Sequence, residues 1–496
     1  MRIRAGLGAL LMGLLATVPV AAQKVPASLT LERAIEIARS NNPSFLQTQN
    51  DQVQADWDVR QAYGQLLPSA SASSGLTWQG AGEQTFGTLT LGDLGFGDLP
   101  SYYLSNYGIN VGMSVSLATV LGPSQAKAVR GATTSRIRAA EAALVAQVTG
   151  AYLEVLRQQE GLRLAQQQLE NAQISLRLAQ GRLEVGSATP IDVGQAEVQV
   201  GRADVGVLQA RNAVATGRMR LLQQLGVPVD QEMELGTTFP LTEPTWTLED
   251  LEGTALARNP SLDATRRSKR AADIGVTAAR SPYLPTLSLS TGWSGFTREA
   301  SSTDLQVLQA QASVASQVAG CNATNDLYSR LARPIAPRDC TQYAFTDADR
   351  QSILDQNNQF PFSFQKSPVS VRLGLSIPIF QGFSRQRNLE AAKLQRADLD
   401  QQVREQELAL RADLSVALAT VRTAYESALL EERNRTLAEQ QLRLARERYQ
   451  LGAITFVELI AAQTVMAQAD RDRTAAVFAY HDAVTRLESL VGTSLR

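Results

Sequence analysis

The sequence is poor in the residues that bind metals and carry nucleophilic catalysis. Among its 496 residues there is one histidine, His481, and there are two cysteines, Cys321 and Cys340. This scarcity excludes a His/Cys zinc cluster and a helix with two metal-binding histidines. The GxxxxGK[S/T], GxGxxG, GxSxG and CxxC patterns are also absent, so the common nucleotide-binding and nucleophile motifs are missing. We therefore predict that the protein is not an enzyme and holds no cofactor.

Neither sign of charge dominates the chain. Lys and Arg total 47 against 48 Asp and Glu, which gives a formal net charge of −1. A chain without a global field does not attract nucleic acid, so we expect no nucleic-acid partner. Hydrophobic residues make up 44% and charged residues 19%, which fits neither a disordered chain nor a polytopic helical membrane protein.

The N-terminus has the pattern of a secretory signal. Arg2 and Arg4 precede an uncharged, mostly apolar stretch, which ends in Val20-Ala21-Ala22 before Gln23. This pattern predicts a signal peptide over residues 1–22, and it fits an uncleaved membrane anchor less well because the stretch is short and contains Pro19. No later segment reaches about 18 uninterrupted apolar residues, so we expect any insertion into a membrane to be by strands.

The chain contains an internal duplication. Thr30-Leu31-Glu32 recurs as Thr247-Leu248-Glu249, and Asn42-Pro43-Ser44 recurs as Asn259-Pro260-Ser261, both at an offset of 217 residues. Further along, the offset is 266: Leu176, Arg182, Gly186 and Gly226 correspond to Leu442, Arg448, Gly452 and Gly492. Such order at constant offsets indicates two copies of one structural unit.

These offsets divide the mature chain into parts. The first repeat covers 23–226, a proline-containing linker covers 227–246, and the second repeat covers 247–496. The offset grows because the second repeat carries an insert at about 297–367, which holds both cysteines. We predict that Cys321 and Cys340 form a disulfide in this exported surface loop, with two free thiols as the alternative.

Each repeat contains a long stretch with helical periodicity. The apolar or small seam positions are Leu144, Val148, Ala151, Val155, Gln158 and Leu162 in the first copy, and Leu410, Leu414, Ala417, Val421, Ala424 and Ala428 in the second. Both stretches lack proline, at about 124–185 and about 384–451, which predicts helices of about 60 residues, or roughly 90 Å. A structural coiled coil of the envelope is one alternative, but the seams are rich in alanine and strands interrupt the pattern.

Other segments alternate with period two, as strands do. Ile109, Val111, Met113, Val115 and Leu117 alternate with small polar residues, and so do Val369, Val371, Leu373, Leu375 and Ile377. Segments 70–78 and 286–293 do the same more weakly. This is the pattern of a transmembrane β-barrel with an apolar outside, with a soluble sandwich sheet as the alternative. The pattern places Arg372 on the inward side, where it would either line the pore or form a salt link on the periplasmic side. Four strands cannot close a barrel, so other subunits must complete it.

In this order the motifs resemble the TolC-like outer-membrane efflux protein family. The resemblance rests on the duplicated Thr-Leu and Asn-Pro openings, on Pro378-Ile379-Phe380-Gln381-Gly382, and on the Tyr-x-x-Gly pattern at 449–452. It implies a mainly α protein with a membrane β portion, in which a homotrimer forms a twelve-stranded barrel in outer-membrane lipid and an α-helical tunnel in the periplasm. It implies a passive duct for drugs or secreted polypeptides that works with a periplasmic adaptor (membrane fusion) protein and an inner-membrane pump of the ABC or RND type.

Two details refine this expectation. Gln23 follows the predicted cleavage site where lipid-anchored members have a cysteine, which favours the type I polypeptide-secretion branch.

A substrate-specific porin would use the same strands but has no need of helices of this length, and it remains the second alternative.

The helical hairpin tips are the predicted functional site. Gly186 and Gly452 each precede a threonine by three residues, Thr189 and Thr455, and an acid follows each threonine by three residues. This spacing predicts a helix end, a turn and a capped new helix.

The resemblance implies gate roles at these tips. Tyr449 would hold Asp192 across the two hairpins, and Glu458 would belong to a ring of acids at the entrance. Ile454 stands where the family has an arginine and Ala461 where it has a second acid, so we expect a weaker and less cation-selective closed state than in members that keep both.

Overall fold

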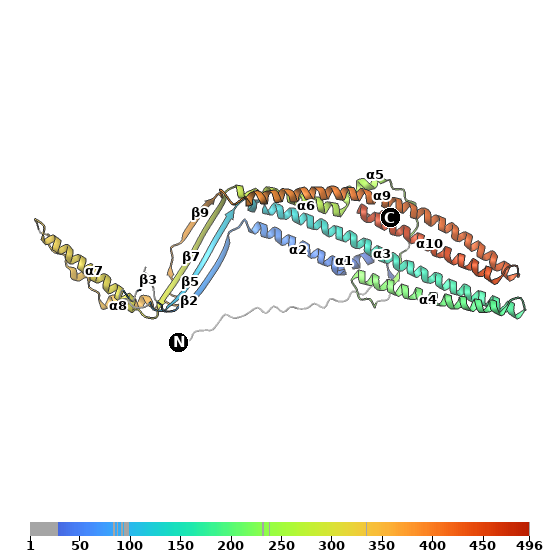
Figure 1. The fold of residues 1–496 in the computed structure, drawn as a ribbon, viewed down its shortest axis with the longest axis horizontal. Coiled ribbons are helices and arrows are strands. Elements are labelled where there is room, and N and C mark those ends of the chain that lie inside the picture. The colour runs from blue at the N-terminus through green and yellow to red at the C-terminus, as the bar shows by residue number, and fades with distance from the viewer. Residues whose placement is uncertain are drawn as a thin grey trace. The chain divides into compact units, whose positions relative to one another are not determined.

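The computed structural model describes residues 28–82, 85–86, 88–90, 93, 99–230, 233–237, 239–333 and 335–495. The predicted signal peptide, 1–22, lies outside these residues. Two compact units divide the chain (Figure 1). One holds most of the helices and is built from residues up to 59, 124–276 and 391–496; the other holds the strands and is built from 60–123 and 277–390.

The helices come in the order that the duplication predicts. Their bounds are α1 Leu31–Asn41, α2 Pro43–Gly64, α3 Leu117–Glu184, α4 Pro190–Leu225, α5 Leu248–Arg258, α6 Pro260–Ala278, α9 Ser384–Gln450 and α10 Phe456–Val491. The long helix of the first repeat begins earlier than expected, because Pro123 lies inside α3 and does not mark its start. A two-residue strand, β1 Ser28–Leu29, pairs in parallel with β6 Glu234–Leu235.

The two repeats form the same local structure at corresponding residues. The Asn42 side chain donates to the Gln224 carbonyl at 2.8 Å and accepts from the Phe45 amide at 3.0 Å. In the second copy, Asn259 donates to the Leu490 carbonyl at 2.9 Å and accepts from the Leu262 amide at 3.0 Å. Each asparagine thus caps one helix and ties it to the end of a long hairpin, which explains the repeated Asn-Pro pattern.

The predicted helix seams form two hydrophobic cores. Leu144, Val148 and Val155 of α3 pack with Tyr152 and with the end of α4. Leu410, Leu414, Ala417 and Val421 of α9 pack with α5 and with the end of α10. Each core therefore joins a long helix to the opening helices of its own repeat.

The strands form one sheet in the order β2, β5, β7, then β8 and β9. The bounds are β2 Ser69–Gln79, β5 Tyr102–Val115, β7 Thr286–Ala300, β8 Gln365–Lys366 and β9 Ser370–Ser376, and a separate pair joins β3 Thr85–Phe86 to β4 Leu89–Thr90. All pairings in the sheet are antiparallel, and β8 and β9 pair with successive parts of β7. β2, β5 and β7 lie side by side in Figure 1.

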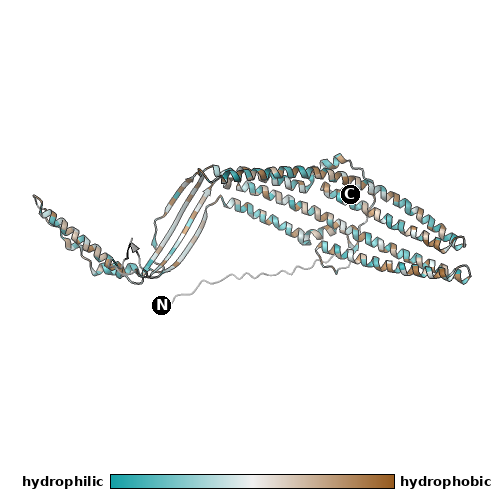
Figure 2. Ribbon diagram, viewed as in Figure 1, coloured by the Kyte–Doolittle hydropathy of each residue, from teal (hydrophilic) through white to brown (hydrophobic). Residues whose placement is uncertain are grey.

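The register gives the sheet two different faces. Met113 lies opposite Leu289, which lies opposite Leu373, so one face is apolar across three strands. One residue along, Ser114 lies opposite Ser288, which lies opposite Gly374. Apolar and polar residues accordingly alternate along the strands in Figure 2. We call these faces the apolar face and the polar face.

The insert folds as helices next to the sheet. β7 continues to Ala300, so the insert begins later than the sequence indicates, and α7 Asp304–Ser329 and α8 Asp347–Asn357 follow. A disulfide joins Cys321 of α7 to Cys340, with the two Cα atoms 5.8 Å apart. Asn357 closes the insert against β7, because its side chain accepts from the Ala300 amide and donates to the Ala300 carbonyl.

By length and composition alone, one described helix contains a window apolar enough to cross a membrane. This helix is α3, and a third of the window is buried inside the protein.

Candidate functional site

The hairpin turns have the geometry that the sequence predicts. Gly186 and Gly452 adopt φ values of 77° and 78°, which side chains with a Cβ rarely tolerate. After α3, the Ser187 amide donates to the Arg182 carbonyl at 2.7 Å, and after α9 the Ala453 amide donates to the Arg448 carbonyl at 2.8 Å. Both helices therefore end in the left-handed cap that glycine favours.

The next helices begin with reciprocal caps. The Thr189 amide donates to the Asp192 carboxylate at 2.8 Å, and the Asp192 amide donates to the Thr189 hydroxyl at 3.3 Å. In the second hairpin, Thr455 and Glu458 make the same pair of bonds at 2.7 and 3.3 Å. These bonds satisfy amides that the helix itself leaves unpaired.

Arg182 connects the two hairpins. Its guanidinium donates to the Tyr449 carbonyl at the end of α9 and to the Ser187 carbonyl at 3.0 Å in its own turn. The same group lies over the Tyr449 ring, 4.4 Å from the ring centroid. One cation thus binds a carbonyl at the end of α9, where the helix dipole places negative charge, and a carbonyl in the turn after α3.

The bond between Tyr449 and Asp192 that the family resemblance implies is not formed. The Tyr449 hydroxyl is buried and has no hydrogen-bond partner within the described residues, while Asp192 binds Thr189. Burial raises the pKa of the Tyr449 hydroxyl, the Arg182 guanidinium opposes this shift, and the Asp192 carboxylate adds to it. The expected contact was wrong because the cap holds Asp192 and the arginine comes from the first repeat.

Glu458 is exposed at the start of α10. Its hydrogen bonds from the Thr455 amide and hydroxyl lower the pKa of the Glu458 carboxyl below its ordinary value. Glu458 therefore remains a fixed negative charge at the tip near neutral pH.

Further polar contacts tie α3 to the second hairpin. Arg446 of α9 donates to the Asn171 side chain at 2.7 Å, and Gln463 of α10 donates to the Ser175 hydroxyl at 2.6 Å. Burial lowers the pKa of the Arg446 guanidinium, which stays far above the physiological range. Beside them lies a cavity of about 250 Å³, lined by residues of α3, α4, α9 and α10.

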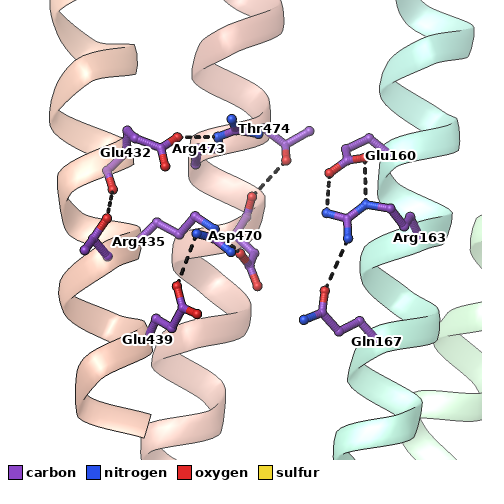
Figure 3. A network of polar contacts seen from close by, with 10 residues as sticks. Glu160, Arg163, Gln167, Glu432, Arg435, Glu439, Asp470, Arg473 and Thr474 are labelled. Carbon is purple, nitrogen blue, oxygen red and sulfur yellow. Dashed lines mark hydrogen bonds and ion pairs between the residues drawn. The ribbon is translucent and has the colours of Figure 1, made fainter. Parts of the chain in front are cut away.

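A group of charged residues follows farther from the tips (Figure 3). Arg435 of α9 binds the buried Asp470 of α10 at 2.9 Å, and Arg473 binds Glu432 at 2.7 Å. On α3, hydrogen bonding to Arg163 lowers the pKa of Glu160, and the fields of Arg473 and Arg435 act in the same direction. Opposite charges therefore face each other between the two hairpins.

Arg182 is the tip residue that the sequence analysis did not select. Its signal was available, since Arg182 and Arg448 correspond in the duplication, but nothing in that match tells which of the two bridges the hairpins. Within the described residues no group of three or more His, Cys, Asp or Glu side chains could hold a metal ion.

The sequence profile described as "Outer membrane efflux protein" matches residues 34–227 and 346–493. The chain belongs to the outer membrane efflux protein family. Members of this family lie in the outer membrane with their helical part in the periplasm, and this chain is placed there accordingly. The profile skips most of the insert, so α7 and the disulfide lie outside the matched residues.

Individual family members show moderate similarity. The toluene efflux pump outer membrane protein TtgC of Pseudomonas putida is 24% identical over 286 residues, which cover 55% of this chain and 53% of the relative. The pyoverdine export outer membrane protein OpmQ of Pseudomonas aeruginosa is 31% identical over 167 residues, covering 33% of this chain and 34% of the relative. The chain thus spans about half the length of TtgC and about a third of the length of OpmQ.

The fold is also that of solved outer-membrane channels. The CmeC outer membrane channel of Campylobacter jejuni superposes with a TM-score of 0.69 at 13% identity, over 93% of this chain and 85% of that one. The whole architecture of sheet and helical hairpins is therefore shared with that channel.

Proposed function

We propose that this outer membrane efflux protein acts as a homotrimeric, passive export duct. Three sheets close a twelve-stranded barrel in the outer membrane, and the helices form a tunnel in the periplasm. Cargo enters from an inner-membrane pump, of the ABC or RND type, through a periplasmic adaptor protein.

The open sheet carries this proposal. β2 and β9 each pair with one neighbour among the described strands, so each has a free edge. The apolar face is exposed, with Val371, Leu373 and Leu375 between 66% and 72% accessible. A lipid-facing sheet cannot leave its edges unpaired, because each unsatisfied backbone group costs several kcal/mol in hydrocarbon. Pairing between copies satisfies both edges.

The hairpin tips supply the gate of this duct. Asp192, Tyr449 and Glu458 remain the proposed gate residues, and Arg182 provides the bond that holds the hairpins together. Ile454 stands where the family has an arginine, and in this proposal Arg182 of the first repeat takes over part of the role of that arginine.

The cargo class follows the relatives. The names of TtgC and OpmQ refer to toluene and pyoverdine, which are small molecules. This supports small-molecule export over the polypeptide secretion that Gln23 favours.

The experiment uses the purified full chain in detergent and in planar bilayers. Chemical cross-linking should give a series that ends at the trimer, and the reconstituted trimer should conduct ions. A protein that cross-links only to monomer or dimer contradicts the assembly. A trimer that is silent in bilayers, even after Arg182→Gln, contradicts the duct.

A further inference from the structure

A cavity lies against the polar face of the sheet, and polar side chains lean over the glycines of this face. A cavity of about 410 Å³ lies against it, lined by residues that include Asn110, Ser290 and Arg372. A Cβ atom added at Gly292 would lie 2.9 Å from the Asn110 side-chain oxygen, and one at Gly374 would lie 2.8 Å from the Ser288 hydroxyl. In the proposed barrel the apolar face meets lipid, so this polar face lines the inside.

Only positive charges lie on the polar face of the described strands. The register places Arg372 opposite Ser290 and places Arg298 opposite Leu104, both on this face. The other residues of the face on these strands are uncharged, mostly Ser, Gly, Asn and Thr. The acid of β7, Glu299, belongs to the apolar face and accepts from the Phe360 amide.

The two arginine side chains differ in how firmly other residues hold them. Arg298 is held over the Tyr102 ring, 3.8 Å from its centroid. Arg372 is exposed, and no ion pair joins it to another described residue. Arg372 is therefore the cation that a solute on this face would meet, with hydroxyls of Ser290 and Ser370 beside it.

We propose that the barrel interior is anion-selective and that Arg372 is the residue that determines this selectivity. The inference rests on the proposed trimeric duct, in which three copies of Arg372 lie at the same height. A ring of arginines with no acid on the same strands concentrates anions and repels cations. The cargo class that this interior favours is therefore an anionic solute, such as a carboxylate or a phosphate ester.

The test measures reversal potentials of trimers in planar bilayers under a KCl gradient. Because Glu458 places a negative charge at the tips, the measurements are made in a Glu458→Gln background. In this background the channel with Arg372 intact, called the wild type here, should pass Cl⁻ in preference to K⁺. Arg372→Gln should reduce the Cl⁻/K⁺ permeability ratio several-fold, and Arg372→Glu should invert the preference. Arg372→Lys, which keeps the charge, should retain it.

Lys366→Gln is the matched control. This variant also removes one positive charge per chain, but Lys366 pairs with Gly295 and lies on the apolar face. Its reversal potential should equal that of the wild type. Equal permeability ratios for wild type, Arg372→Gln and Arg372→Glu, in channels that conduct, would overturn the selectivity and leave the duct standing. Trimers that do not conduct would instead reject the duct itself.

Discussion

At the scale of single residues, one cation joins the two hairpin tips. The Arg182 guanidinium binds the end of α9 and the turn after α3, and it covers the Tyr449 ring. Such charged hydrogen bonds with a stacked ring contribute roughly 1 to 3 kcal/mol at a half-buried site. The contribution recurs in each subunit of the proposed trimer, so a single substitution acts three times.

Arg182→Gln should raise the single-channel conductance. The change removes the stacked cation and its bonds to the end of α9 and the turn after α3, so the closed tips should separate more readily. Tyr449→Phe should leave the conductance unchanged, because it keeps the ring and removes a hydroxyl without a hydrogen-bond partner among the described residues.

The repeat supplies a control for this comparison. Arg448 corresponds to Arg182, but its side chain is exposed at the end of α9. Arg448→Gln should conduct like the wild type. Equal conductance in Arg182→Gln and Arg448→Gln would show that Arg182 does not hold the tips.

The cap of α10 should weaken in acid. Because the folded state lowers the pKa of Glu458, this carboxylate stabilises the helix start above the ordinary value of 4.5, and the effect is lost as the pH falls through the lowered pKa. Hydrogen exchange at the Thr455 amide, corrected for the intrinsic rate, should accelerate in that window. Glu458→Gln should accelerate it already at pH 7, and a wild-type rate for this variant would refute the assignment.

At the scale of elements, local patterns identify most of the fold. The proline-free stretches at about 124–185 and 384–451 correspond to α3 and α9, and the alternating segment 369–377 contains β9. The threonine caps were predictable too, because they depend on residues three apart. The bond from Arg182 to Tyr449 joins residues 267 apart in sequence, so it depends on how the hairpins meet.

The insert shows another limit of local patterns. α7 carries charged residues only at Asp304 and Asp326, and its Gln, Ala and Ser residues give no clear periodicity. Its order comes from distant partners. Cys340 bonds to Cys321, and Asn325 exchanges two hydrogen bonds with the backbone of Arg338.

The disulfide should hold the end of α7 to the following loop. Closing a loop of 19 residues stabilises the insert by about 3 kcal/mol. The unreduced, unfolded protein should bind no thiol reagent. Reduction, or replacement of both cysteines by serine, should speed tryptic cleavage at Arg330 and Arg338. Cleavage at the α9 arginines serves as the internal control, and labelling of both thiols without reductant would contradict the bond.

At the scale of the whole molecule, the sheet is the part that cannot function alone. The helical hairpins bury their seams within one chain. The sheet of described strands leaves the outer edges of β2 and β9 unpaired and its apolar face uncovered. Lipid can cover the face but cannot pair the edges. In the proposed trimer, the pairing between copies is therefore decided at β2 and β9.

Cysteine pairs across these edges should report the number of subunits. Ala72 of β2 would be replaced by cysteine and combined in turn with cysteine at Val371, Leu373 or Leu375 of β9, all on the apolar face. Because β2 and β9 lie at opposite edges of the sheet, only neighbouring chains can join them. At the correct register, non-reducing gels should show monomer, dimer and trimer and nothing larger. Each single-cysteine variant should stay monomeric on the same gels. A ladder that continues beyond three chains would indicate a wider barrel, and an absence of linked chains at every register would show that these edges do not meet.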